Sequence, residues 1–149
     1  MEEILKYENR ERLYKFLIDD LGFIKAEEKY SHESFGNFYV ILSGKEFLLM
    51  YVNDRSFLTI RIASHTDSTH WYDLSFIENF IYNPNNINPA DLPEIDNEGR
   101  IETLNIFLRK DLKRINDLFN RENYFKTKEQ LDYLLREQFK LRFPGMVKE

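Results

Sequence analysis

The sequence contains no cysteine. This excludes disulfide bonds, thiolate metal sites and cysteine nucleophiles, and it fits a reducing compartment. The first ten residues, MEEILKYENR, are acidic and polar, without the basic start and apolar run of a secretory signal. No stretch approaches the roughly 18 apolar residues that a membrane-spanning helix needs. We therefore expect a cytoplasmic protein without a membrane segment.

Glycine and proline are scarce, with 5 and 4 residues, and no internal repeat is visible. By contrast, 42% of the 149 residues are hydrophobic and 15% are aromatic. This composition predicts one folded domain over residues 1–149 with a single core. The formal net charge is −5, so we do not expect a nucleic-acid partner, whereas a basic protein would be attracted.

The common nucleotide and hydrolase motifs are also missing. The sequence has no Gly-x-x-x-x-Gly-Lys, no Gly-x-Gly-x-x-Gly and no Gly-x-Ser-x-Gly. We therefore assign no catalytic residue and no cofactor, and the balance favours a protein that is not an enzyme.

The N-terminal half predicts a helix followed by strands. Apolar residues at helical spacing cover Glu2–Asp20, and Gly22 follows at the usual stop position. A weakly alternating, charged segment, Gly22–Tyr30, suits an edge strand. Three segments rich in β-branched and aromatic residues then read as strands: Phe35–Leu42, Glu46–Val52 and Phe57–Ala63.

Short turns at Ser43–Gly44 and near Asn53–Asp54 would pair these strands as a meander. A two-residue first loop pairs Leu42 with Lys45, and a two-residue second loop pairs Leu49 with Leu58. With this pairing, every second side chain of the three strands lies on one face, and all of these side chains are apolar or aromatic. A register slip of one residue would distribute them over both faces. The face comprises Phe38, Val40, Leu42, Phe47, Leu49, Tyr51, Leu58, Ile60 and Ile62.

Three helices should follow the strands. They are predicted over Trp71–Tyr82, over Arg100–Asn120 and from Thr127, where Gln130 gives a capping-box spacing, to Pro144–Gly145. The expected buried stripe of the last helix is Leu131, Leu134, Leu135 and Phe139. The predicted fold is thus α+β: an antiparallel three- to four-stranded meander, preceded by one helix and followed by about three.

A long segment, Asn83–Glu98, contains three prolines and four acids and should be a loop. Loops of this length in compact domains are often functional. The second face of the sheet is mixed but apolar in its middle, which indicates a covering helix or a partner. The predicted contact surface combines the loop acids with aromatic and apolar residues: Asp91, Glu94, Asp96, Glu98, Tyr39, Met50, Phe57 and Trp71.

The segment around His65, Asp67 and His70 offers an alternative. Two imidazoles and a carboxylate could bind a divalent metal or perform acid–base chemistry, as in a metal-dependent hydrolase. The spacing matches no established metal pattern, and Asp67 is also a plausible helix cap.

Residues 35–75 resemble a strand–turn–strand core of small bacterial proteins. The residues that carry the resemblance are Phe35–Gly36–Asn37, Asp54–Arg55 and Trp71. Several such proteins resemble immunity proteins of polymorphic toxin systems, which neutralise a toxin by binding it. The resemblance implies a non-enzymatic protein-binding domain of immunity or inhibitor type. A homo-oligomeric structural or regulatory module that covers the second sheet face with its own copy is a further alternative.

Overall fold

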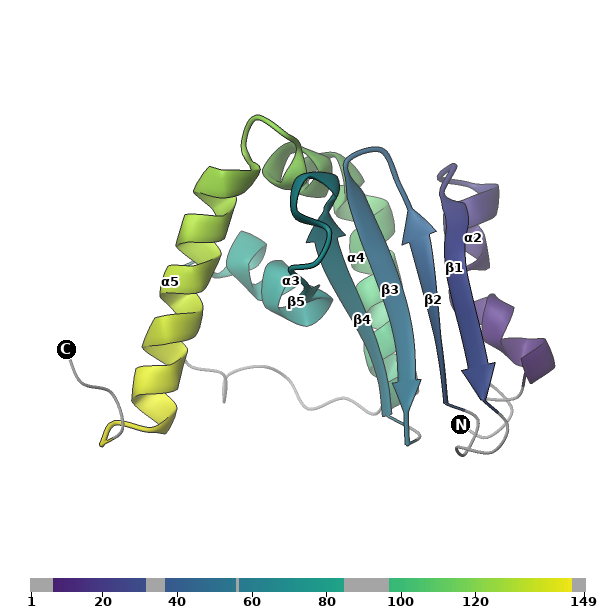
Figure 1. The fold of residues 1–149 in the computed structure, drawn as a ribbon, viewed down its shortest axis with the longest axis horizontal. Helices are drawn as coiled ribbons and strands as arrows, with labels where there is room; N and C mark the ends of the chain where they lie inside the picture. Colours follow the sequence, from purple (N-terminus) through teal and green to yellow (C-terminus); the bar gives the residue numbers. More distant parts are fainter. Residues whose placement is uncertain (1–6, 32–36, 56, 85–96, 146–149) are drawn as a thin grey trace.

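The computed structural model of the protein describes residues 7–31, 37–55, 57–84 and 97–145. They form an α+β fold with one antiparallel sheet (Figure 1). The helical elements are η1 (Tyr7–Leu13), α2 (Lys15–Asp19), η2 (His65–Asp67), α3 (Leu74–Tyr82), α4 (Asn97–Phe119) and α5 (Tyr124–Arg142). The strands are β1 (Ile24–Ser31), β2 (Asn37–Ser43), β3 (Phe47–Asp54), β4 (Phe57–Ser64) and β5 (Tyr72–Asp73).

The sheet is a simple meander in the order β1-β2-β3-β4-β5. The α+β class and the antiparallel meander are therefore confirmed, and β1 is the predicted edge strand. The count of three to four strands was too low, because Tyr72–Asp73 pairs with β4 instead of opening the next helix. The nine side chains expected on one face, Phe38 through Ile62, are all buried, so the predicted facing of the strands is confirmed.

The first hairpin differs from its predicted pairing. Leu42 pairs with Leu49 and not with Lys45, so each partner lies four residues further along β3. The reason is that the turn lies two residues later than the predicted Ser43–Gly44. It is closed by the amide of Gly44, which donates to the carbonyl of Phe47 at 2.9 Å. An even shift leaves every side chain on its predicted face, because the side-chain period of a strand is two.

The second hairpin shows the same error. Asp54 pairs with Phe57, so the turn lies two residues later than the predicted Asn53–Asp54. Arg55 occupies the left-handed region with a φ of 53°, which suits a tight hairpin turn. Its amide donates to the Asn37 side-chain carbonyl at 2.8 Å, which ties the turn to β2.

The N-terminal segment is not the single helix predicted for Glu2–Asp20. In the described part it is the 3-10 helix η1 followed by the short α2, with a break at Tyr14, whose φ and ψ are −130° and 5°. Tyr14 and Leu17 are buried under the sheet, so tertiary packing overrides the helical repeat here. Gly22 has a φ of 76°, as expected of a residue that ends a helix.

The C-terminal helices differ from the prediction mainly at their ends. The side chain of Asp73 accepts a hydrogen bond from the Ser75 amide and starts α3. Helix α4 begins at Asn97, so the predicted loop to Glu98 ran two residues too far. Asp111, at φ −110° and ψ 20°, kinks α4.

Helix α5 begins at Tyr124, earlier than predicted. Thr127 is buried inside the helix, so the proposed capping box with Gln130 was wrong. Instead, the Asn120 side chain accepts the Asn123 amide at 2.8 Å just before the helix. Of the expected buried stripe, Leu131 and Leu134 are buried. Leu135 and Phe139 are 40% and 46% exposed, since the C-terminal half of α5 lies apart from the strands in Figure 1.

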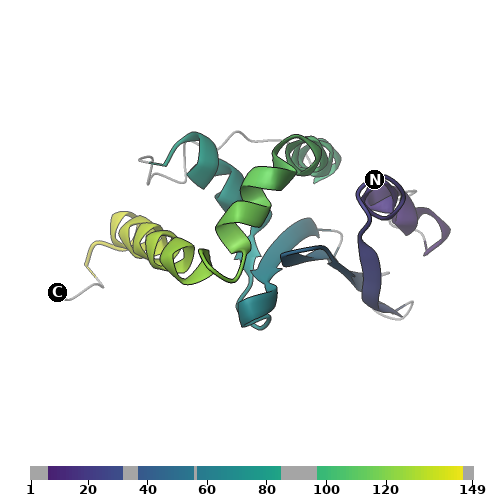
Figure 2. The ribbon, with the colours of Figure 1, turned by 90° about the horizontal axis from the view of Figure 1, so that it is seen from above.

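Most of the helices lie on one side of the sheet. Figure 2 shows η1, α2, α3 and α4 on that side, with α5 beyond the β5 edge and η2 on the opposite side. The buried stripe of α4 includes Leu104, Leu108 and Ile115, which close the core over the nine-residue face. None of the helices in the described ranges is both long and apolar enough to cross a bilayer.

A buried polar link joins three elements of the core. The Tyr51 hydroxyl on β3 donates to the Asn105 side-chain carbonyl on α4 at 2.6 Å. The Asn105 amide group in turn donates to the Leu13 carbonyl of η1 at 2.9 Å. The link fixes α4 and η1 against the sheet, since each buried polar atom that it satisfies would otherwise carry a desolvation cost.

Candidate functional site

The second face of the sheet is the main candidate site, and we call it the open face. Side chains along each strand point alternately to the two faces, so the residues between the core residues point to this face. It consists of Glu27 and Lys29 on β1, Tyr39 and Ile41 on β2, Leu48, Met50 and Val52 on β3, and Phe57, Thr59 and Arg61 on β4.

The open face is not covered by any helix of the described ranges, apart from the 3-10 turn η2 near one end (Figure 2). Its β2 and β3 side chains are half-buried by their neighbours, and Phe57 is 57% exposed. Near η2, Ala63 on the same side of β4 is fully buried. The free part therefore lies towards Phe57, away from η2.

The middle strands of the open face are apolar and its flanks are charged. Ile41, Met50 and Val52, each half-buried, occupy the middle, and a contiguous apolar patch that no described helix covers is typical of an interaction site. Glu27 lies on one flank, where its hydrogen bond with Tyr39 raises the pKa of the Tyr39 hydroxyl. Lys29 lies on the same flank as Glu27, and Arg61 lies on the opposite flank.

The structure brings together part of the contact surface that the sequence predicts. Tyr39, Met50 and Phe57 share the open face. Trp71 is half-buried and directly precedes β5. Three of the acids, Asp91, Glu94 and Asp96, lie outside the described residues. Glu98 belongs to α4, and its side chain is outside the description.

The three side chains of the alternative metal site turn to different partners. The His65 Nε2 lies 2.8 Å from the Gly44 carbonyl oxygen. Asp67 accepts a hydrogen bond from the Tyr124 hydroxyl at 3.1 Å. The His70 Nε2 lies 3.9 Å from an oxygen of Asp132. Within the described residues, no group of three His, Asp or Glu side chains is arranged to hold a metal ion.

Two tyrosines and two aspartates form a cluster that the sequence did not predict. The Tyr72 hydroxyl donates to Asp132 at 2.7 Å, and Lys128 approaches the other Asp132 oxygen at 3.2 Å. Tyr124 and Asp67 lie beside them. Burial, and then the hydrogen bonds to Asp132 and Asp67, raise the pKa of Tyr72 and of Tyr124 well above the usual range. Both hydroxyls are therefore donors at neutral pH, and we interpret the cluster as a clamp that holds α5 to the sheet.

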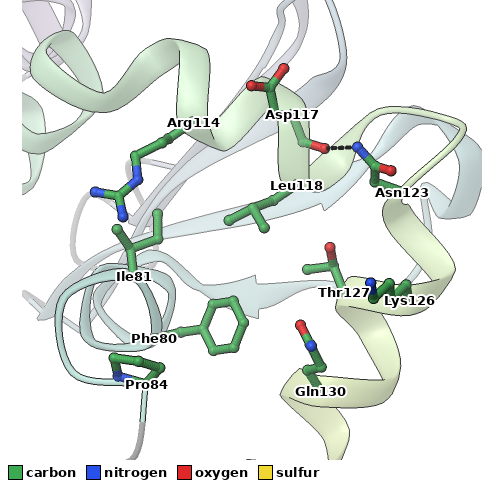
Figure 3. A pocket seen from close by; sticks show the side chains of 10 residues that line it. All are labelled: Phe80, Ile81, Pro84, Arg114, Asp117, Leu118, Asn123, Lys126, Thr127 and Gln130. Atoms are coloured by element: carbon green, nitrogen blue, oxygen red, sulfur yellow. Dashed lines mark hydrogen bonds between the residues drawn. The ribbon is translucent and has the colours of Figure 1, made fainter.

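A pocket of about 430 Å³ lies between α3, α4 and α5 (Figure 3). Phe80, Ile81 and Leu118 give it an apolar wall, and Arg114 and Lys126 line it with positive charge beside the acidic Asp117. These features would suit a small anion with an apolar part. Arg114 already lies 3.8 Å from the Asp111 carboxylate in its own helix, which lowers the charge available to a ligand.

The comparisons with known proteins do not add a relative. No family model, no curated protein and no solved structure matches this chain. The proposed function therefore rests on the open face, which extends over four strands.

Proposed function

We propose that this chain is a non-enzymatic protein-binding domain that docks a partner protein on the open face, as immunity or inhibitor proteins do. The observation that supports the proposal is the apolar middle of that face, formed by Ile41, Met50 and Val52 on the side away from η1, α2, α3 and α4. A docked protein would remove these side chains from water, which is the main favourable term in most associations.

The charge of the chain adds to the argument for a basic partner. The net charge of −5 would speed the encounter with a basic protein through long-range attraction. The flanking charges of the open face, Glu27 and Arg61, would then orient the partner more than they would add to the affinity.

The test compares one substitution on the open face with a matched one elsewhere. Met50→Glu places a charge in the middle of the face, whereas Ile106→Glu does the same at a 67%-exposed position on α4. The tagged wild type and both variants are used to capture partners from the native host, and the affinity for the recovered protein is then measured by calorimetry. We expect Met50→Glu to bind at least about tenfold more weakly and Ile106→Glu to bind like the wild type.

Two results would contradict this proposal. One is equal affinity of all three proteins for the recovered partner, and the other is that the wild type recovers none. The inhibitor role is examined with the product of the gene immediately upstream. If that product is toxic, co-expression of the wild type should restore growth and co-expression of Met50→Glu should not. Equal protection by both proteins would contradict the inhibitor role on this face.

A further inference from the structure

The strand register places four residues of the open face in one straight row. Glu27 pairs with Ile41, Ile41 with Met50, and Met50 with Arg61. The row therefore crosses β1, β2, β3 and β4 and reads acidic, apolar, apolar, basic, and beyond it the exposed Asp73 of β5 pairs with Arg61. Such a row has opposite charges at equal distances from its midpoint, which lies between Ile41 and Met50.

This pattern is complementary to its own rotated copy. A two-fold axis parallel to the strands, midway between β2 and β3, exchanges β1 with β4 and β2 with β3. It therefore places Glu27 of one copy against Arg61 of the other, twice per dimer, and Ile41 against Met50. We infer that the open face docks a second copy of this chain in this orientation. The inference rests on the proposed function, because it uses the same face, but it names a second copy of this acidic chain in place of a basic partner.

The geometry of packed sheets is compatible with these contacts. Two stacked sheets lie about 10 Å apart and cross at about 30°. With strands about 4.8 Å apart, Glu27 and Arg61 lie about 7 Å from the axis, so the crossing displaces them by about 4 Å. Two long side chains can span that offset. In the next row Lys29 meets Thr59 of the other copy, so no like charges are opposed there.

The size of the free face sets the expected strength of the dimer. Four strands and about six residues along each give about 400 Å² per copy, or about 800 Å² in total. The turn η2 limits the free part of the face at the end away from Phe57. Stable complexes usually bury about 1,600 Å², so we expect a weak, reversible dimer that forms as the concentration rises.

Sedimentation velocity on the full chain, from about 10 μM to about 1 mM, tests the inference. The variants are Glu27→Arg, Arg61→Glu and the double charge swap, with Glu102→Arg on the exposed side of α4 as the matched control. Each single substitution opposes like charges twice and should weaken the dimer at least about tenfold. The double swap should restore the association to within about threefold of the wild type, and the control should not change it. Circular dichroism melting verifies that every variant is folded.

Three results would overturn the inference: a wild type that stays monomeric throughout, single variants that associate like the wild type, or a double swap that does not recover. The capture experiment separates these failures from failure of the proposed function. If the wild type is monomeric and binds a foreign partner that only Met50→Glu loses, the second copy is ruled out and the docking face is supported. If the wild type forms a dimer that responds to the charge swaps as expected and captures no foreign partner, the second copy is supported and the inhibitor role is ruled out.

Discussion

The buried arginine of η1 allows a quantitative test of what holds the N-terminal segment on the sheet. Arg10 is 2% exposed, and its guanidinium donates to the Glu28 carboxylate on β1. It also lies 5.2 Å from the centre of the Tyr30 ring. Glu28 receives two further groups, Lys25 at 2.9 Å and the Tyr14 hydroxyl at 3.3 Å. The carboxylate of Glu28 is thus the centre of a network that fastens η1 to the edge strand.

Arg10→Met keeps most of the side-chain volume and removes the charge. Removing one partner of a buried ion pair typically costs about 3–5 kcal/mol. Here Glu28 is 22% exposed and keeps its contact with Lys25, so we reduce the expected loss to about 2–3 kcal/mol. At about 2–4 °C per kcal/mol for a domain of this size, the melting temperature should fall by about 5–10 °C.

The loss should depend on pH in a defined direction. Burial alone would raise the pKa of Glu28, but the hydrogen bonds from Lys25 and Arg10 outweigh it and hold that pKa below its ordinary value of 4.5. A group with a lowered pKa in the folded state stabilises the fold above its unfolded pKa, and this contribution is lost as the pH falls through the folded pKa. The difference between wild type and Arg10→Met should therefore be full at pH 7 and shrink in acid below about pH 4.5.

Urea unfolding at neutral and acid pH measures both effects. Arg12→Met, at an exposed position of the same 3-10 helix, is the matched control. Glu28→Gln and its combination with Arg10→Met complete a double-mutant cycle, which should give a coupling energy of about 1–3 kcal/mol. Equal stability of Arg10→Met and Arg12→Met at pH 7, or a loss that persists unchanged in acid, would show that the Arg10–Glu28 pair does not hold η1 on the sheet.

Two further substitutions examine the buried link and the α5 clamp. Tyr51→Phe removes the donor to Asn105 and leaves a half-buried acceptor, so urea unfolding should show a loss of about 1–3 kcal/mol, whereas Tyr133→Phe at an exposed position should cost almost nothing. Equal stabilities of Tyr51→Phe and Tyr133→Phe would show that the hydrogen bond between Tyr51 and Asn105 does not stabilise the fold. Asp132→Ala removes the acceptor of Tyr72 and should speed amide hydrogen exchange in α5 but not in β3. Unchanged exchange in α5 would show that other contacts hold this helix.

The sequence predicts which side of each strand faces the core better than it predicts strand partners. The alternation of Val40, Leu42 and Leu49 with half-exposed neighbours fixes the facing, because burying one such residue buries every second one. The partner of each residue depends on where the turn closes. The local sequence does not show whether the first turn is closed by Leu42 and Lys45, as predicted, or by Gly44 and Phe47, as observed.

Contacts between distant segments were beyond prediction from local patterns. Tyr72 and Asp132 are 60 residues apart, and no spacing rule connects them. Arg10 reads as one of many charges on a predicted helix surface, yet it is buried, because Glu28 occupies a core-facing position of β1. Both cases need the tertiary arrangement, since a charge is buried only where a partner compensates its desolvation.

Two apolar surfaces compete as the docking site, and their construction favours the sheet. Helix α5 and the residue that follows it expose Leu135, Phe139 and Phe143 at 40%, 46% and 42%, and the two phenylalanine rings lie 5.1 Å apart. This surface comes from one helix, whose described contacts with the sheet centre on the clamp at Tyr72. The open face is instead held by three ladders of backbone hydrogen bonds between β1, β2, β3 and β4. A face with fixed side-chain positions loses less entropy on binding, so specific docking should use the sheet, and α5 should add affinity only after contact.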